Sequence, residues 1–147
     1  MEHGWIGVDL DGTLAEYHGW VDATNIGKPI PLMIDRVKLW LSEGKVVKIF
    51  TARICVETNK DVVVAAIKSW CIEHIGQALE ITNVKDLTMI ELWDDRCVQV
   101  MINTGMTPFE IEAMKRSEER HARAQQFHTA KSPKHQLAPP LRLKKRW

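Results

Sequence analysis

Short apolar runs alternate along this chain with longer segments that have the periodicity of helices, and this alternation constrains the fold more than any other feature. Five runs have the length of strands, at residues 5–10, 45–53, 79–84, 88–93 and 97–103. Between the first two, residues 30–44 repeat apolar side chains at the spacing of one helical face and end at a glycine. Strands that alternate with helices are typical of a doubly wound α/β fold with a mostly parallel sheet. We therefore expect a five-stranded sheet flanked by helices.

Two further helical segments are expected. Residues 58–76 repeat the helical pattern and again close on a glycine. Thr107 and Glu110 have the spacing of a capping box, and Pro108 between them suits the first turn of a helix. That helix becomes polar towards its end, and residues 132–140 have lost periodicity and are typical of a linker.

Charge divides the chain unevenly. Residues 1–119 hold 12 of the 20 basic residues and all 19 acidic ones, whereas residues 120–147 hold 8 basic residues and no acidic one. A basic tail can attract nucleic acid or an acidic partner, or it can dock on the acidic body. We expect one domain at residues 1–116, followed by a polar helical extension and a basic tail at residues 117–147.

The cysteines favour a cytoplasmic location. Cys55, Cys71 and Cys97 are odd in number and widely spaced, which disfavours a disulfide framework and a CxxC metal site. No apolar run approaches the ~20 residues that span a membrane, and we expect no secretory signal and no membrane partner. The oligomeric state stays open, with a homodimer as one alternative.

Polar residues follow four of the expected strands. Asp9 and Asp11 end the first strand, and Thr51 ends the second. Lys85 follows the third, and the pair Asp94–Asp95 follows the fourth. Because ligands bind beyond the carboxyl ends of strands in such sheets, we expect these side chains to meet at one edge.

Carboxylates gathered at one locus repel one another, and a divalent cation would resolve that conflict. Oxygen ligands without histidine or cysteine favour a hard ion, and Mg²⁺ suits a site that keeps several waters. Mg²⁺ together with a lysine and a hydroxyl can bind a phosphoryl group, and an aspartate can accept it covalently. The sequence therefore favours phosphoryl-transfer chemistry.

The same residues carry a resemblance to a family. The stretch "DLDGT" at residues 9–13, then Thr51, Lys85 and "WDD" at residues 93–95, resembles the four motifs of the haloacid dehalogenase (HAD) superfamily of phosphatases. The match runs over residues 5–105 and implies a Rossmann-like, Mg²⁺-dependent enzyme. The gaps between the motifs leave no room for a cap domain, so we expect a small capless member.

The resemblance implies a role for each carboxylate. Asp9 would attack phosphorus and form an aspartyl-phosphate, while Asp11 would act as general acid and then general base. The metal ligands would be Asp9, the backbone carbonyl of Asp11, Asp94 and, directly or through water, Asp95. A second aspartate two residues after the first is what the phosphatases of this superfamily have.

The resemblance also implies how the phosphoryl group would be held. Thr51 and Lys85 would bind its oxygens, and Lys85 would keep Asp9 ionised. Backbone N–H groups near Leu10 and Ala52 would add donors. Thr13 is either a ligand of the substrate or a turn cap.

Two arginines complete the set of candidates. Arg53 either reaches the phosphate of the substrate as a bidentate donor or pairs with Asp95 or Asp61. Arg96 is expected to face away from the site and make a surface pair. The aromatic residues of the connection at residues 15–29 would touch the substrate or pack that connection.

The functional prediction is a Mg²⁺-dependent phosphomonoester hydrolase whose substrate is a nucleotide or another small phosphate ester. One alternative is a polynucleotide 3′-phosphatase that uses the basic tail, since "TAR" at residues 51–53 is similar to the motif of such enzymes. Another is a phospho-accepting switch of the receiver type, although the order of the motifs favours the phosphatase. A non-catalytic binding protein is the third alternative.

Overall fold

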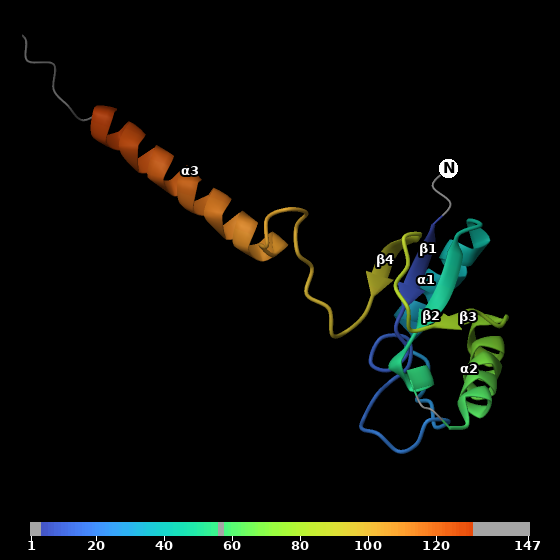
Figure 1. Ribbon diagram of the computed structural model, residues 1–147. Coiled ribbons are helices and arrows are strands. Elements are labelled where there is room, and N and C mark those ends of the chain that lie inside the picture. The colour runs from blue at the N-terminus through green and yellow to red at the C-terminus, as the bar shows by residue number, and fades with distance from the viewer. Residues whose placement is uncertain (1–3, 56–57, 131–147) are drawn as a thin grey trace, which may run out of the picture. The chain divides into compact units, whose positions relative to one another are not determined.

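The structure is a computed structural model, and it describes residues 4–55 and 58–130. The chain forms two compact units, Met1–Cys97 and Val98–Trp147, which are described separately below. Figure 1 shows the elements in chain order.

The first unit is built on a parallel four-stranded sheet with the order β3-β2-β1-β4 (Figure 1). Its strands are β1 (Trp5–Val8), β2 (Val46–Phe50), β3 (Glu80–Thr82) and β4 (Met89–Trp93). Every neighbouring pair is parallel, so all four carboxyl ends lie at one edge. This confirms the α/β fold with a parallel sheet.

Two helices cover one face of the sheet. Helix α1 (Pro31–Ser42) begins with a proline, which suits the first helical position, and α2 (Lys60–Ile75) ends at Gly76 in the left-handed conformation. The two helices and the inward side of the strands share a single core, which includes Ile6, Val8, Val37, Val47, Ile49, Val63 and Ile67. Strands β1, β2 and β3 follow one another across the sheet in a single direction. Because crossovers between parallel strands are right-handed, both connecting helices then lie on the same face of the sheet.

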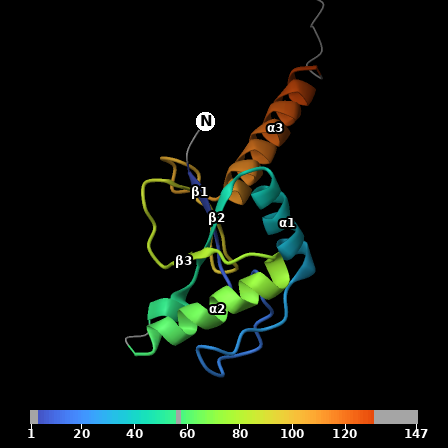
Figure 2. The same cartoon turned by 90° about the vertical axis from the view of Figure 1, so that its right-hand side faces the viewer.

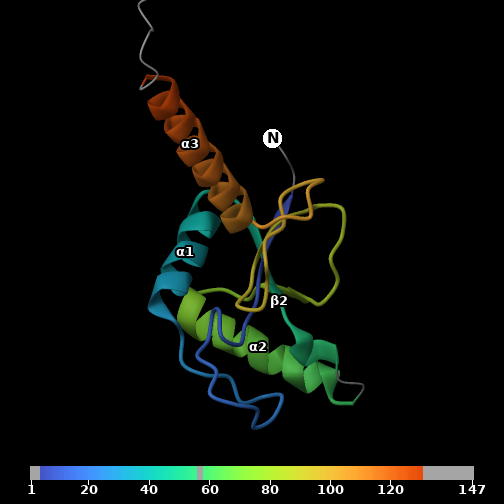
Figure 3. The same cartoon turned by 90° about the vertical axis from the view of Figure 1, so that its left-hand side faces the viewer.

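The opposite face is covered by an aromatic side chain and a loop. The Trp5 indole lies against Gly7, donates from Nε1 to Asp86 Oδ1 at 2.9 Å, and carries Lys48 Nζ at 4.8 Å from its ring centroid. Figures 2 and 3 show the connection at residues 83–88 on the side of the strands opposite α1. Among residues 4–55 and 58–97 no helix packs on this face, so the sheet is wound on one side and the expected doubly wound arrangement is not seen.

The expected fifth strand at residues 97–103 is wrong. The chain turns after β4, where the backbone N–H of Arg96 donates to Asp94 Oδ1 at 2.7 Å, and the following residues form no strand. Val98, Val100 and Ile102 keep their alternation but are exposed. Alternation alone does not make a strand, because a strand also needs a hydrogen-bonding partner.

The second unit contains α3 (Pro108–Ala130), which begins at the expected capping box. Thr107 donates from its backbone N–H and its hydroxyl to Glu110 Oε2, at 2.7 and 2.9 Å, and the Glu110 N–H donates back to Thr107 Oγ1 at 3.2 Å. The expected domain boundary after residue 116 falls inside this helix. The linker and most of the basic tail fall in residues 131–147, outside the described part of the chain. None of the described helices is long and apolar enough to cross a membrane.

Candidate functional site

Three carboxylates from two strand ends form the centre of the site. Asp9 follows β1, and its backbone N–H donates to the Trp93 carbonyl at 2.8 Å. Asp94 and Asp95 follow β4 directly. One oxygen from each of the three carboxylates lies within 4.8 Å of the others, so the group could hold a metal ion. Parallel pairing of β1 with β4 brings these distant residues together.

The electrostatics of this cluster favour a bound cation. Burial, above all, and then the negative charges of Asp94, Asp95 and Asp11 raise the pKa of Asp9 from 3.8 to about 7, while a hydrogen bond from the Leu10 backbone acts in the opposite direction. A divalent cation between the carboxylates would remove this repulsion. The donors are oxygens alone, so the set fits a hard ion such as Mg²⁺.

The turn after β1 positions the loop after β4. Thr13 Oγ1 accepts a hydrogen bond from the Asp95 backbone N–H at 3.0 Å. Gly12 has a φ of 88°, and a Cβ at this position would lie 2.8 Å from Asp95 Oδ2. The Thr13 hydroxyl therefore holds the loop after β4, a role that neither of its two expected alternatives, a substrate ligand or a turn cap, describes. Gly12 leaves the space that the Asp95 carboxylate occupies.

A cavity of about 310 Å³ opens beside the carboxylates. The residues that line it are Asp9, Asp11, Tyr17, Trp20, Phe50, Thr51, Ala52, Arg53, Asp94 and Arg96. Thr51 Oγ1 accepts from the backbone N–H of Arg53 at 3.2 Å. Its hydroxyl proton has no acceptor among the described residues, so this group remains able to donate to a ligand.

Four expected site residues do not line the cavity: Leu10, Thr13, Lys85 and Asp95. The side chain of Leu10 is fully buried in the core, so only its backbone remains available to the site. Lys85 is exposed on the loop between β3 and β4 and is not among the lining residues. Arg96, expected to face away, lines the cavity, and Phe50 was not anticipated at all.

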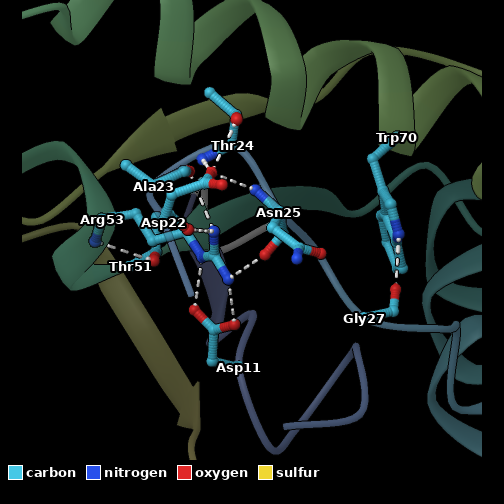
Figure 4. A network of polar contacts seen from close by, with 9 residues as sticks. All are labelled: Asp11, Asp22, Ala23, Thr24, Asn25, Gly27, Thr51, Arg53 and Trp70. Carbon is cyan, nitrogen blue, oxygen red and sulfur yellow. Dashed lines mark hydrogen bonds and ion pairs between the residues drawn. The ribbon is translucent and has the colours of Figure 1, made fainter. Parts of the chain in front are cut away.

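Arg53 is held by a complete set of hydrogen bonds (Figure 4). Its Nε and Nη2 donate to the two carboxylate oxygens of Asp11, each at 2.7 Å. Its remaining bonds reach the backbone carbonyls of Asp22 at 3.2 Å, Ala23 at 2.9 Å and Asn25 at 2.8 Å. A guanidinium has five N–H donors, and here all five are in use.

This arrangement corrects the expectations for Arg53 and separates Asp11 from the metal cluster. Arg53 is only 5% exposed and pairs with Asp11, not with Asp95 or Asp61. It has no donor left for a substrate. Both oxygens of Asp11 face Arg53, so the side chain does not join the three clustered carboxylates, and the role of its carbonyl on a metal stays a prediction.

The three carbonyls that Arg53 binds belong to a closed loop, residues 16–28, which we call the flap. The Glu16 N–H donates to the Lys28 carbonyl at 2.8 Å, so the ends of the flap meet as in an Ω-loop. Trp70 of α2 donates from Nε1 to the Gly27 carbonyl at 3.0 Å (Figure 4). A Cβ on Gly27 would lie 1.9 Å from the Glu16 carbonyl oxygen, so this closure needs glycine.

The inside of the flap is ordered by an aspartate. Asp22 Oδ1 accepts from the Thr24 N–H and hydroxyl, each at 2.7 Å, and from the Asn25 N–H at 2.8 Å. These bonds, led by that of the Thr24 hydroxyl, hold the pKa of Asp22 below its usual value. The flap is therefore tied internally, at its ends and to Arg53.

The flap presents two aromatic side chains to the cavity. Tyr17 is 38% exposed and Trp20 is 56% exposed, and the Trp20 ring centroid lies 5.3 Å from the Arg53 Cζ. In the sequence, these residues are recognisable as an aromatic pair within an otherwise polar connection. Its position beside the carboxylates depends on the Arg53 bonds, which no local pattern predicts.

No protein-family model matches this sequence, and no curated protein matches it either. Among solved structures, this chain is similar to a conserved protein from Bacteroides thetaiotaomicron, with a TM-score of 0.46 and 22% sequence identity. The similarity covers 78% of this chain and 90% of that one.

Proposed function

We propose that this chain is a Mg²⁺-dependent phosphomonoester hydrolase of the HAD type. The observation that carries the proposal is the convergence of Asp9, Asp94 and Asp95, with Thr51 lining the same cavity as Asp9 and Asp94. These residues come from three strand ends and coincide with three of the four motif positions. Solubility alone does not account for a half-buried carboxylate that faces two others.

The proposed reaction has two steps. An oxygen of Asp9 attacks phosphorus, the bond from phosphorus to the leaving oxygen breaks, and Asp11 gives that oxygen a proton. Asp11 then takes a proton from water, the water oxygen attacks phosphorus, and Asp9 leaves as a carboxylate. Mg²⁺ held by Asp9, Asp94 and Asp95 would neutralise charge on the phosphoryl oxygens. The Thr51 hydroxyl would donate to one of those oxygens.

The pairing with Arg53 imposes a condition on this scheme. Both oxygens of Asp11 accept hydrogen bonds from the guanidinium. To protonate the leaving oxygen, Asp11 has to give up at least one of these bonds. We therefore infer that substrate binding shifts Arg53 or the flap that it holds.

The size and lining of the cavity favour a small ester with a planar leaving group, such as a nucleoside monophosphate. A volume of about 310 Å³ is at the small end of ligand pockets. Tyr17 and Trp20 offer aromatic surface, on which every nucleobase can stack. The alternative polynucleotide-end substrate would use the basic tail and predicts activity that falls steeply with salt.

The test is a phosphatase assay on the full chain with Mg²⁺, using p-nitrophenyl phosphate, nucleoside monophosphates, sugar phosphates and 3′-phosphorylated oligonucleotides. We expect turnover that is lost on chelation and in Asp9→Asn, and kept in Asp35→Asn, which changes an exposed carboxylate of α1. Absence of turnover across the panel would count against the proposal. An aspartyl-phosphate that persists for minutes would support the receiver-type switch.

A further inference from the structure

A phosphoryl group in this cavity needs a positive side chain in addition to the metal ion. The transferred group carries charge on three oxygens, and cationic side chains stabilise it as that charge moves. Three cationic residues occupy or closely follow the expected motif positions in the sequence: Lys85, Arg53 and Arg96. The inference below rests on the proposed function, since it assigns the cation of that same site.

The surroundings of two of the three candidates disfavour a role in binding phosphate. Lys85 is exposed on the loop between β3 and β4 and lies outside the set of cavity-lining residues. Arg53 lines the cavity, but its five N–H donors all have acceptors. In this structure Arg53 therefore has no donor free for a phosphate, and any bond that Asp11 gives up on substrate binding would release only donors that face the Asp11 carboxylate.

Arg96 has the opposite properties. It lines the cavity, and its guanidinium has no hydrogen bond or ion pair with any of the residues that the structure describes. Its backbone is nevertheless fixed, because its N–H donates to Asp94 Oδ1 at 2.7 Å. A metal-cluster carboxylate thus holds the base of an arginine whose charged end is free.

We propose that Arg96 is the phosphate-binding cation of this cavity, in the role that the resemblance assigns to Lys85. A guanidinium presents paired N–H donors that match two oxygens of a phosphate, which an ammonium does not. Arg96 follows the metal-binding pair directly along the chain, so binding of the metal and of the phosphate are linked through one turn. Lys85 then has no contact with the substrate.

Kinetics of four variants test this assignment. Arg96→Ala is expected to lower kcat/KM on nucleoside monophosphates by at least 100-fold, and Arg96→Lys is expected to recover part of that loss. Lys85→Ala is expected to stay within threefold of the wild type, as is the surface control Lys38→Ala on α1. A 100-fold loss in Lys85→Ala, or activity within threefold in Arg96→Ala, would overturn the assignment.

A binding measurement separates this inference from the proposed function. With Mg²⁺ present, inorganic phosphate is expected to raise the melting temperature of the wild type and of Lys85→Ala, but not of Arg96→Ala. If the wild type hydrolyses no ester and still shows this pattern, the hydrolase proposal fails while Arg96 stands as a phosphate-binding residue. Equal phosphate-induced shifts in Arg96→Ala and the wild type, or no shift in the wild type, would refute Arg96. Circular dichroism of each variant checks that the fold is intact.

Discussion

Replacing Asp9 by asparagine is expected to stabilise the metal-free protein at alkaline pH. Ionising a carboxyl whose pKa is raised from 3.8 to about 7 costs the folded state about 4 kcal/mol well above that pH. Because Asp9 is only partly buried, solvent screening reduces this cost, and we expect about 2 kcal/mol. Asparagine keeps the shape and the acceptor oxygen but never ionises.

The pH dependence gives the sign of the effect. The folded state binds the Asp9 proton more tightly than the unfolded state. Protonated Asp9 therefore contributes fully to the free energy of unfolding below pH 3.8, and this stabilisation is lost as the pH rises through about 7. The free energies of unfolding of Asp9→Asn and the wild type should therefore agree at pH 4 and differ most at pH 8.5. Urea unfolding with a chelator present measures the free energy of unfolding of each protein at each pH.

Mg²⁺ should reverse the order of stability. At one hundred times its dissociation constant, a ligand that binds only the folded state stabilises it by about 2.7 kcal/mol, which exceeds the roughly 2 kcal/mol advantage of metal-free Asp9→Asn. Asp9→Asn gains less, because it lacks one of the three charged donors. The control Asp35→Asn should change the free energy of unfolding by less than about 0.5 kcal/mol at either pH. The reasoning is refuted if Asp9→Asn is no more stable than the wild type at pH 8.5 without metal.

Three other predictions follow from the site. Arg53→Lys cannot replace five buried hydrogen bonds, so the free energy of unfolding should fall by about 2 kcal/mol, and limited proteolysis should cut first within the flap at residues 16–28. Trp20→Ala should raise KM about tenfold for nucleoside monophosphates, where a stacked base contributes about 1–3 kcal/mol, and should leave KM for glycerol phosphate unchanged; equal effects on both would exclude stacking. Calorimetric titration should show that Mg²⁺ binds more weakly below pH 7, since the proton on Asp9 competes with the metal. A Mg²⁺ affinity that does not vary from pH 5 to 8 would exclude Asp9 as a ligand.

The sequence was sufficient to predict the parallel sheet and the carboxylate cluster. Both follow from topology, because the carboxyl ends of parallel strands share one edge wherever the chain crosses back. Asp9 and Asp94 therefore meet although 84 residues separate them along the chain. The role of Gly12 in the turn could also be predicted from the sequence, since a tight turn after a buried strand favours glycine.

The cations could not be placed in the same way. The orientation of Lys85 depends on how residues 83–88 cross the helix-free face of the sheet, and no local pattern encodes that path. Arg53 is paired with Asp11 because the flap folds back over it, which is a long-range event. Arg96 is exposed, as expected, but it lines the cavity instead of facing away from it.

Arg53 holds the flap through carbonyl oxygens of Asp22, Ala23 and Asn25, and every amino acid supplies that atom. The attachment is therefore indifferent to most side chains that the flap carries. Tyr17 and Trp20 can change under selection for another substrate while the anchoring remains as it is. In this molecule the part that would choose the leaving group is free to evolve separately from the part that would carry out the reaction.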